Sequence, residues 1–331
     1  MNIVRETAMW KAITVGALAA ACAGIAAAAE PQDSYPSRPV RFVVPFTVGG
    51  SADNYARILA HKVSDIWGRQ VVIDNRAGSN GIIGTDVVAK APPDGHTLLL
   101  GTGGNIATNP VLYKRLPYRA SDFAPVTLMS TSPFVLLTPV SLPVHTVQEL
   151  LALAKAKPGQ LNYVSTGIGS PGHLTAELLA VTTGIRIVHV PYKSHGVMMA
   201  DMAAGQVHLW FNGIAPAQAQ MKVGKVRALA VTSATRARAM PTVPTIAESG
   251  VPGYEVIGWY GVFVPAGTPP GIVQKLNRSL VSALRQPEVR DRFLADGAEP
   301  VGDEPGQFAG FVKAEMAKWA KLVKTTGITA D

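Results

Sequence analysis

The sequence predicts an α/β protein of about two domains with largely parallel sheets, and three observations support this. The chain has 331 residues, of which 47% are hydrophobic and 16% charged. This is enough for a substantial core at roughly 150 residues per domain. Short apolar runs alternate with segments of helical periodicity, which is typical of βαβ units. A strand, a Gly-rich loop and a helix follow one another twice, at 40–67 and at 162–181, which suggests one such unit in each domain.

The individual elements follow from the spacing of apolar residues and from the Pro and Gly residues at their ends. Apolar runs predict strands at 40–46, 71–73, 97–100, 163–164, 187–190, 207–211 and 226–231. Helical spacing predicts helices at 52–67, 81–91, 147–156, 174–181, 197–204, 215–223, 272–284, 288–295 and 308–323. Prolines crowd at 133–143 and at 241–254, which predicts two crossings between the domains and a return of the last helices to the first domain.

The N-terminus has the pattern of a cleavable export signal covering residues 1–29. Arg5 and Lys11 precede an Ala-rich apolar run that ends in Ala27-Ala28-Ala29, an A-x-A-type cleavage site. Two alternatives stay open: a membrane anchor, since the run is near the lower limit for a span, and lipidation of Cys22. Cys22 is the single Cys, so cleavage leaves a chain without disulfides or Cys-based zinc sites. We expect a periplasmic protein.

The charge balance narrows the classes of partner. The formal net charge is +8, and removing the export signal leaves about +7, which favours anionic partners in general. Lys and Arg are scattered and are not interleaved with aromatic residues, so we expect no nucleic acid partner. No later stretch approaches 18 apolar residues, so no span is predicted after the leader.

The first segment with the chemistry of a ligand site is PFTVGGSAD, Pro45–Asp53. It joins a strand to a helix, where ligands of α/β sheets bind. Gly49 and Gly50 allow close approach of a ligand, and Ser51 is the expected N-cap of a helix whose free N–H groups attract an anion. Asp53 is predicted to complement the helix dipole instead of contacting the ligand. The alternative is a plain strand-to-helix turn.

The second segment is LNYVSTGIGSPGHL, Leu161–Leu174. Ser165, Thr166 and Ser170 offer hydroxyl groups, and Pro171 suits the first position of a helix. The run from 167 to 172 spells G-x-G-x-x-G, but residues 186–195 lack the acid that a dinucleotide site requires. Ile168 also breaks the esterase pattern G-x-S-x-G.

The third segment is HVPYKSHG, His189–Gly196, at the end of another predicted strand. Tyr192 and Lys193 could donate hydrogen bonds to an anion, although an ordinary solvated lysine is the alternative. The seven His residues lack zinc-site spacing. No carboxylate pair suggests acid–base catalysis, so we expect no metal, no cofactor and no enzyme activity.

These and further segments resemble, in order and over almost the whole chain after the leader, the substrate-binding proteins of tripartite tricarboxylate transporters, the Bug-type periplasmic receptors. The resemblance is carried by Tyr35–Asp53, Asn75–Gly101, Leu161–Leu174, His189–Lys193, Gly224–Ser233, Val243–Tyr254, Phe263–Pro270 and Asp296–Gly302. The chain departs from the family at two places. Thr47-Val48 stands where Pro or Ala-Pro often precedes the Gly pair, and Ser194-His195 follows the Tyr-Lys pair where Gly is usual.

The resemblance implies a two-domain, type II-like Venus-flytrap fold with the ligand cleft between the lobes. Lobe I would be 36–134 with 254–331, and lobe II 135–253. It also implies a carboxylate ligand held largely by backbone N–H groups and waters. The ligand-binding residues it implies are Phe46, Thr47, Val48, Gly49, Gly50, Ser51, Thr102, Asn105, Ser165, Thr166, Gly167, Ile168, Gly169, Ser170, Tyr192 and Lys193.

The function that the resemblance implies is a monomeric receptor that delivers a small mono-, di- or tricarboxylate to membrane permease subunits. Two alternatives remain. The receptor could serve a signalling protein, or the chain could be an exported hydrolase that uses Ser170 with His173, although no acid is evident to orient this His.

Overall fold

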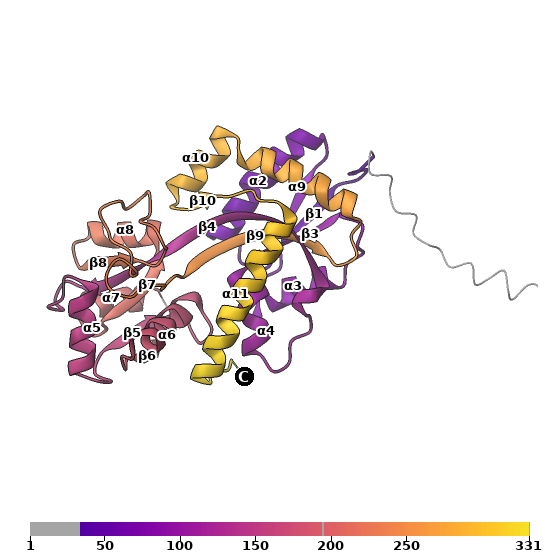
Figure 1. Ribbon diagram of the computed structural model, residues 1–331. Coiled ribbons are helices and arrows are strands. Elements are labelled where there is room, and N and C mark those ends of the chain that lie inside the picture. The colour runs from indigo at the N-terminus through magenta and orange to yellow at the C-terminus, as the bar shows by residue number, and fades with distance from the viewer. Residues whose placement is uncertain (1–33, 194, 331) are drawn as a thin grey trace, which may run out of the picture. The chain divides into compact units, whose positions relative to one another are not determined.

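The computed structural model describes residues 34–193 and 195–330, so the predicted export signal with Cys22 lies outside the described residues. From Pro36 onward the chain forms one compact unit. This unit is built on a 10-stranded sheet in the order β2-β1-β3-β9-β4-β7-β5-β6, with β8 and β10 also paired to β4 (Figure 1). The predicted α/β class is therefore confirmed.

The strands and helices have the following bounds. The strands are β1 Val40–Val44, β2 Val71–Asn75, β3 Thr97–Thr102, β4 Phe123–Pro139, β5 Asn162–Ser165, β6 Val188–Pro191, β7 Leu209–Gly213, β8 Val226–Val231, β9 Ile257–Pro265 and β10 Glu299–Pro300. The helices are α2 Ser51–Trp67, α3 Ile82–Ala89, α4 Asn109–Leu112, α5 Val147–Ala156, α6 Pro171–Thr183, α7 His195–Ala203, α8 Ile214–Lys222, α9 Pro270–Leu284, α10 Pro287–Ala295 and α11 Pro305–Thr326. Short helical turns lie at η1 Ser79–Gly81, η2 Gly103–Thr108 and η3 Ala120–Asp122.

Most predicted helices and strands are confirmed, and several helices begin earlier than the apolar spacing indicated. The helices α6, α9, α10 and α11 each begin at a Pro, namely Pro171, Pro270, Pro287 and Pro305. Proline suits the first helical position because its missing N–H has no partner there in any case. The apolar pattern alone marks only the buried part of such a helix.

The sheet is parallel at both ends and antiparallel in the middle, which corrects the prediction of largely parallel sheets. At one end β1 pairs in parallel with β2 and β3, and at the other β5 pairs in parallel with β6 and β7. We call these the β1 end and the β5 end. Between them, β9 runs antiparallel to both β3 and β4, and β4 runs antiparallel to β7.

Strand β4 connects the two ends of the sheet. Its residues from Phe123 to Pro133 pair with β9, and those from Phe134 to Pro139 pair with β7 and β8. The proline-rich crossing predicted at 133–143 therefore begins inside one continuous strand. No strand was predicted anywhere in β4, because its prolines suggested a crossing between domains. Register shifts between Pro125 and Thr127 and between Leu128 and Ser130 interrupt its pairing with β9.

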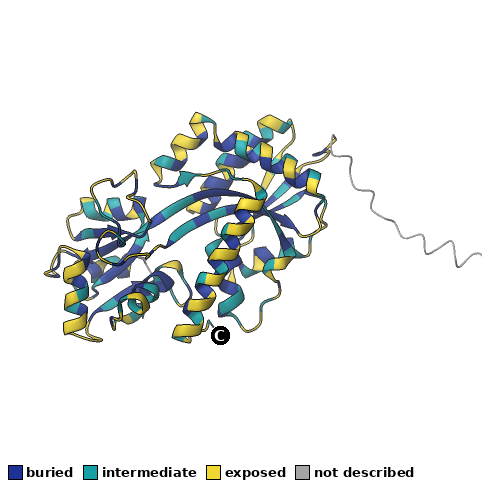
Figure 2. Ribbon diagram, viewed as in Figure 1, coloured by how far each residue is buried: buried dark blue, intermediate teal, exposed yellow. Residues whose placement is uncertain are grey.

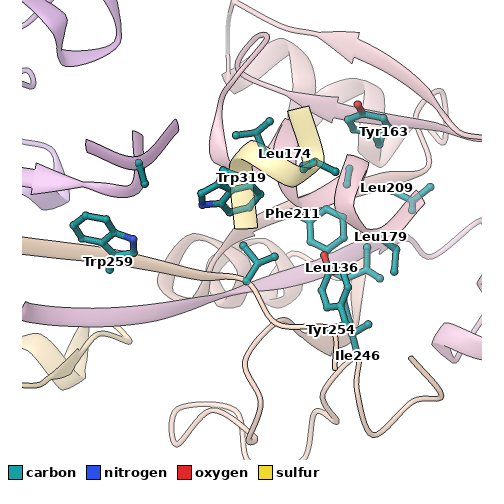
Figure 3. Packing of buried hydrophobic residues seen from close by; sticks show 14 of the residues in the cluster. Leu136, Tyr163, Leu174, Leu179, Leu209, Phe211, Ile246, Tyr254, Trp259 and Trp319 are labelled. Atoms are coloured by element: carbon teal, nitrogen blue, oxygen red, sulfur yellow. The ribbon is translucent and has the colours of Figure 1, made fainter. Parts of the chain in front are cut away.

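The hydrophobic core follows these central strands, and the exposed residues lie mainly on the outer faces of the helices (Figure 2). Leu136 of β4, Phe211 of β7, Leu174 of α6 and Trp319 of α11 belong to one buried cluster. Figure 3 shows Trp319 beside Leu174, so the C-terminal helix packs against α6 at the β5 end. The C-terminal helix thereby helps to hold the two ends of the sheet together.

Candidate functional site

A cavity of about 610 Å³ lies where the loops after β1, β3, β5 and β7 meet the edge of β9. Strand β3 ends at Thr102, which pairs with Tyr260, so the residues of β9 that precede Tyr260 have no β3 residue beside them. Gly258 lies in this part of β9 and lines the cavity. The carboxyl ends of the parallel strands thus face a shared space, as expected for ligand sites of α/β sheets.

The loop after β1 contributes Phe46, Gly49, Gly50 and Ser51 to the wall of the cavity. Gly50 is the N-cap of α2, and no side chain among the described residues caps this terminus. The N–H groups of the first helical turn are therefore open to a ligand. This corrects the prediction that Ser51 is the N-cap, since Ser51 is the first residue of the helix.

Asp53 lies in the first turn of α2, as predicted, and its hydrogen bonds also fix the shape of the preceding loop. The residue is buried, at 1% exposed. It accepts hydrogen bonds from the Gly49 N–H, the Arg57 Nε and the Asn75 Nδ2, each at 2.9 Å. Burial alone raises the pKa of Asp53, but the hydrogen bonds and the charge of Arg57 outweigh it and lower the pKa below its ordinary value. Asp53 is therefore ionised at neutral pH and holds Gly49, whose φ of +84° favours glycine.

The remaining first-loop candidates, Thr47 and Val48, are exposed and are not among the described residues that line the cavity. After β3, Thr102 lines the cavity, and its hydroxyl accepts from the N–H groups of Gly104 (3.2 Å) and Asn105 (3.4 Å). Asn105 is fully buried behind it. Its Oδ1 accepts from the Thr102 N–H at 2.7 Å and its Nδ2 donates to Thr85, so Asn105 shapes the turn.

The loop after β5 uses its polar groups within the protein. The Ser165 hydroxyl lies 2.6 Å from His189 Nε2 and accepts from the Gly167 N–H at 3.0 Å. The Gly169 N–H donates to His173 Nδ1 at 3.2 Å. Of the described residues 165–170, Gly169 lines the cavity, whereas Ser165, Thr166, Gly167, Ile168 and Ser170 are not among its lining residues.

Ser170, predicted both as a ligand contact and as a possible nucleophile, is the N-cap of α6. Its hydroxyl accepts from the backbone N–H of His173 at 3.4 Å. The ring of His173 is directed instead to Gly169 through Nδ1. This geometry gives Ser170 the hydrogen bonding of a helix cap.

Tyr192 and Lys193 lie away from the cavity lining in the described part of the chain. The Tyr192 hydroxyl donates to Asp201 Oδ2 at 2.6 Å. Burial, together with this hydrogen bond and the charge of Asp201, raises the pKa of Tyr192 to about 12. Lys193 is exposed. The structure therefore does not bring this pair together with the loops after β1 and β3.

The loop after β7 was not among the predicted site segments, but it lines the cavity with Asn212, Gly213, Ile214 and Ala215. Gly213 is the N-cap of α8, and no described side chain caps this helix. Asn212 Oδ1 accepts from the Gly213 N–H at 2.9 Å, and its Nδ2 is buried without a hydrogen-bond partner in the described residues. The signal was present, because Asn-Gly stands between a predicted strand and a predicted helix.

Residues near the C-terminus complete the wall on the side of α11. Glu315 accepts hydrogen bonds from Trp259 Nε1 (3.3 Å) and Trp319 Nε1 (3.2 Å) and pairs with Lys318. All three of Glu315, Trp259 and Trp319 line the cavity. The contact between Trp259 and Glu315 joins β9 to α11 across 56 residues of sequence. The spacing of apolar residues along the chain does not predict a contact between such distant segments.

The cavity offers backbone N–H groups and hydroxyls to an anion, and cationic side chains are not part of its lining. Of the described residues that line it, none is Lys, Arg or His, and the charged ones are Asp296 and Glu315. No group of His, Cys, Asp or Glu in the described residues has the geometry of a metal site. No described helix has the length and apolar character that crossing a membrane requires.

A second cavity of about 430 Å³ lies nearby and shares Pro133, Ile214 and Ile257 with the first. Its charged lining residues include Arg236 and Arg238, but these are engaged by Glu248 at 2.9 Å and Glu299 at 3.5 Å. We therefore place the candidate site in the larger cavity, where uncapped helix termini are exposed.

Comparisons with known proteins identify the family of this chain. Residues 55–328 match the model of the tripartite tricarboxylate transporter family receptor. The chain is 38% identical to the protein BugT of Bordetella pertussis over 96% of this chain and 98% of that protein. Two solved structures are similar. R. palustris Rpa4515 with adipate has a TM-score of 0.77 and 41% identity, covering 89% of this chain and 99% of that one. MatC of Rhodopseudomonas palustris with bound malate has a TM-score of 0.73 and 33% identity, covering 87% and 100%. The chain therefore belongs to the tripartite tricarboxylate transporter receptor family.

Proposed function

We propose that this protein is a periplasmic receptor that binds a small organic carboxylate in the larger cavity and delivers it to the membrane subunits of a tripartite tricarboxylate transporter. The observation that carries the proposal is the uncapped N-terminus of α2, which opens on the cavity beside Gly49 and Gly50. Free N–H groups at a helix N-terminus form a favourable site for a carboxylate.

The proposed cleft lies between two lobes, residues 36–134 with 254–331 and residues 135–253. The β1 end of the sheet contributes Gly50 and Thr102, and the β5 end contributes Gly169 and Asn212. A carboxylate that contacts both ends binds the closed form more tightly than the open form, and it therefore favours closure. Strand β4 runs from lobe I, where it pairs with β9, into lobe II, where it pairs with β7, and is the proposed hinge.

The ligand contacts of the proposal differ in part from those predicted from the sequence. We retain Phe46, Gly49, Gly50, Ser51, Thr102 and Gly169, which line the cavity, and add Asn212. The unpartnered Nδ2 of Asn212 is the donor that a carboxylate oxygen would satisfy. Thr47, Val48, Thr166, Ile168, Tyr192 and Lys193 would contact the ligand only after movement of the loops, and Asn105 and Ser165 act through the loops that they support.

The relatives' ligands suggest the first compounds to test. One similar structure contains adipate and another contains malate, so we propose that small dicarboxylates are bound, and that binding proceeds without catalysis. A complex with micromolar Kd corresponds to about −8 kcal/mol, which is plausible for several charge-assisted hydrogen bonds.

A thermal-shift and calorimetric screen of mono-, di- and tricarboxylates tests the proposal, with the protein purified from the periplasmic fraction of expressing cells. A ligand at about 100 times its Kd should add roughly 2.7 kcal/mol of stability. The same preparation should have Glu30 as its N-terminal residue by mass spectrometry. If no carboxylate raises the Tm, the proposed ligand class is wrong.

Asn212→Asp supplies a matched variant for the ligand contact. It keeps the size of the side chain but replaces the free donor by a negative charge, so affinity for a carboxylate should fall at least tenfold. Asn162→Asp is the control, because Asn162 is not among the described residues lining the cavity. Equal affinity in the Asn212 variant and in the wild type would remove Asn212 from the site.

A further inference from the structure

The loop after β5 is held by two histidines that no part of the proposed function uses directly. His173, in the first turn of α6, accepts the Gly169 N–H through Nδ1 at 3.2 Å. His189, in β6, contacts the Ser165 hydroxyl through Nε2 at 2.6 Å. The Ser165 hydroxyl in turn bonds the N–H of Gly167 at 3.0 Å. The two rings thus fix the loop at both of its glycines.

The position of this loop matters because it joins the two ends of the sheet. Gly169 lines the larger cavity and has a φ of +76°. A Cβ atom built on it would lie 2.8 Å from Leu112 Cδ1, so the loop packs directly on α4, which follows β3. A shift of Gly169 would therefore change both the wall of the cavity and the contact between the β1 end and the β5 end.

The Ser165–His189 contact has the spacing of a nucleophile and its base, but its surroundings assign it a different role. Ser165 is 2% exposed and is not among the described residues that line the cavity. Its hydroxyl already has contacts to the Gly167 N–H and C=O, at 3.0 and 3.1 Å, besides the imidazole. A hydroxyl enclosed in this way supports the loop and does not reach a bound molecule.

The hydrogen bond from Gly169 requires His173 to be unprotonated at Nδ1, because an imidazolium has only donors. The ring centroids of His173 and His189 lie 4.3 Å apart, so two imidazolium ions would also repel each other. Tyr163 of β5 stacks on both rings, with centroids 5.0 Å from His189 and 6.1 Å from His173. These contacts therefore favour the neutral form of both imidazole rings.

The other titratable groups around the pair do not compensate a positive charge fully. Glu177 of α6 accepts a hydrogen bond from the Tyr163 hydroxyl. Helix α6 also packs against α11, where Glu315 and Lys318 pair with each other. Burial lowers the pKa of His173 to about 4. Burial and the neighbouring His173 lower the pKa of His189 to about 4, and Glu177 opposes this only in part.

We propose that His173 and His189 are positioning residues that hold the loop after β5 in the shape needed for ligand binding, and that protonation of the pair releases this loop. The proposal builds on the proposed function, because the loop borders the proposed ligand cavity. Its first test, however, needs no ligand, so the two can fail separately.

Hydrogen exchange measured by mass spectrometry on the protein without added ligand gives the first test. The peptide 165–173 should be protected at pH 7.5, and its protection factor should fall at least tenfold between pH 6 and pH 4 after correction for intrinsic rates. His173→Asn should keep the protection at pH 4, since the side-chain oxygen of Asn accepts the Gly169 N–H and does not titrate. His173→Leu should lower the protection at every pH.

His61→Asn is the control, because His61 lies on the exposed face of α2 with its side chain 83% exposed. This variant should behave as the wild type does. If the wild-type peptide keeps its protection down to pH 4, or if His173→Asn loses it as the wild type does, the proposal is wrong. If His173→Leu does not fold, the pH dependence of protection in the wild type and in His173→Asn still tests the proposal.

The second test uses adipate, or the dicarboxylate that binds best in the screen, as the probe. Its affinity should fall more steeply from pH 6 to pH 4.5 for the wild type than for His173→Asn, by about tenfold at pH 4.5. Protonation of the probe itself is common to both proteins and cancels in the comparison. Equal pH profiles would contradict the coupling to binding, whereas absence of binding at pH 7.5 would contradict the proposed function instead.

Discussion

Gly50→Val separates the folding role of the first glycine loop from its binding role. Gly50 has φ −79° and ψ 169°, an extended conformation that any residue adopts. A Cβ atom on it would meet only the Thr47 carbonyl oxygen, at 3.7 Å, which is ordinary contact. Replacing glycine lowers the conformational entropy of the unfolded chain, which offsets a small loss of stability in the folded state. The free energy of unfolding should therefore change by no more than about 0.5 kcal/mol.

Ligand binding should respond very differently to this change. The branched side chain stands at the uncapped start of α2 and occupies the space through which a carboxylate reaches the first-turn N–H groups. Loss of two charge-assisted hydrogen bonds, at about 1.5–3 kcal/mol each, amounts to roughly 3–6 kcal/mol. The Kd should therefore rise by at least about 100-fold.

Gly49→Val is the matched comparison. Gly49 has a φ of +84° and open space around its Cβ position, so a side chain there is strained without a clash and should cost about 1–3 kcal/mol of stability. Thermal denaturation and titration calorimetry of both variants with the same dicarboxylate measure the two effects. Unchanged affinity in Gly50→Val, or a loss of stability as large as that of Gly49→Val, would refute the reasoning.

Three further predictions concern the supports of the site and the core. Asp53→Asn removes a buried charge that accepts three hydrogen bonds. Because its partner Arg57 is half-exposed, the free energy of unfolding in urea should fall by only about 1–3 kcal/mol. An unchanged urea midpoint would contradict this role of Asp53. His173 and His189 have pKa values lowered to about 4, so the unfolded chain binds more protons between pH 6.5 and 4. The contribution of the two neutral histidines to the free energy of unfolding should be fully present above pH 6.5 and should fall through this window, by up to about 3 kcal/mol for each group. A free energy of unfolding that does not change with pH in this window would contradict the prediction. Gly261→Ala places a Cβ 2.1 Å from Phe308 Cζ and should destabilise the protein by about 1–3 kcal/mol; full or partial rescue by Phe308→Leu in the double variant distinguishes overpacking from loss of backbone flexibility.

The sequence predicted the outer strands and most helices well because their signals are local. The helix at Val147–Ala156 and the strand at Val226–Val231 have the predicted bounds. Apolar spacing, Gly after a helix and Pro at its start act over a few residues. Strands β9 and β4 were missed because they contain Gly and Pro residues that local rules assign to loops. Their pairing with each other supplies the stability that local propensity lacks.

The candidate site was predictable in part, and the second Gly-rich loop explains the limit. Gly49, Gly50 and Gly169 line the cavity, as expected for Gly-rich loops that follow strands, and Thr102 lines it as the resemblance to the family implied. Ser165 was expected to face a ligand because its hydroxyl follows a strand, but a histidine 24 residues away contacts it. Hydrogen-bond capacity can be read from a sequence, whereas the partner that uses it cannot.

The sequence by itself determined the family and the α/β class. It also indicated the first Gly-rich turn as a candidate anion site, because the N–H groups of the first helical turn have no partner within the helix. Only the tertiary structure decided which turn from the other end of the sheet faces the cavity with unused donors. It is the turn of Asn212 at the start of α8, while the amides of Gly167 and Gly169 are already bonded. The physical reason is that satisfaction of a polar group depends on contacts between segments distant in sequence, which only the packed chain brings together.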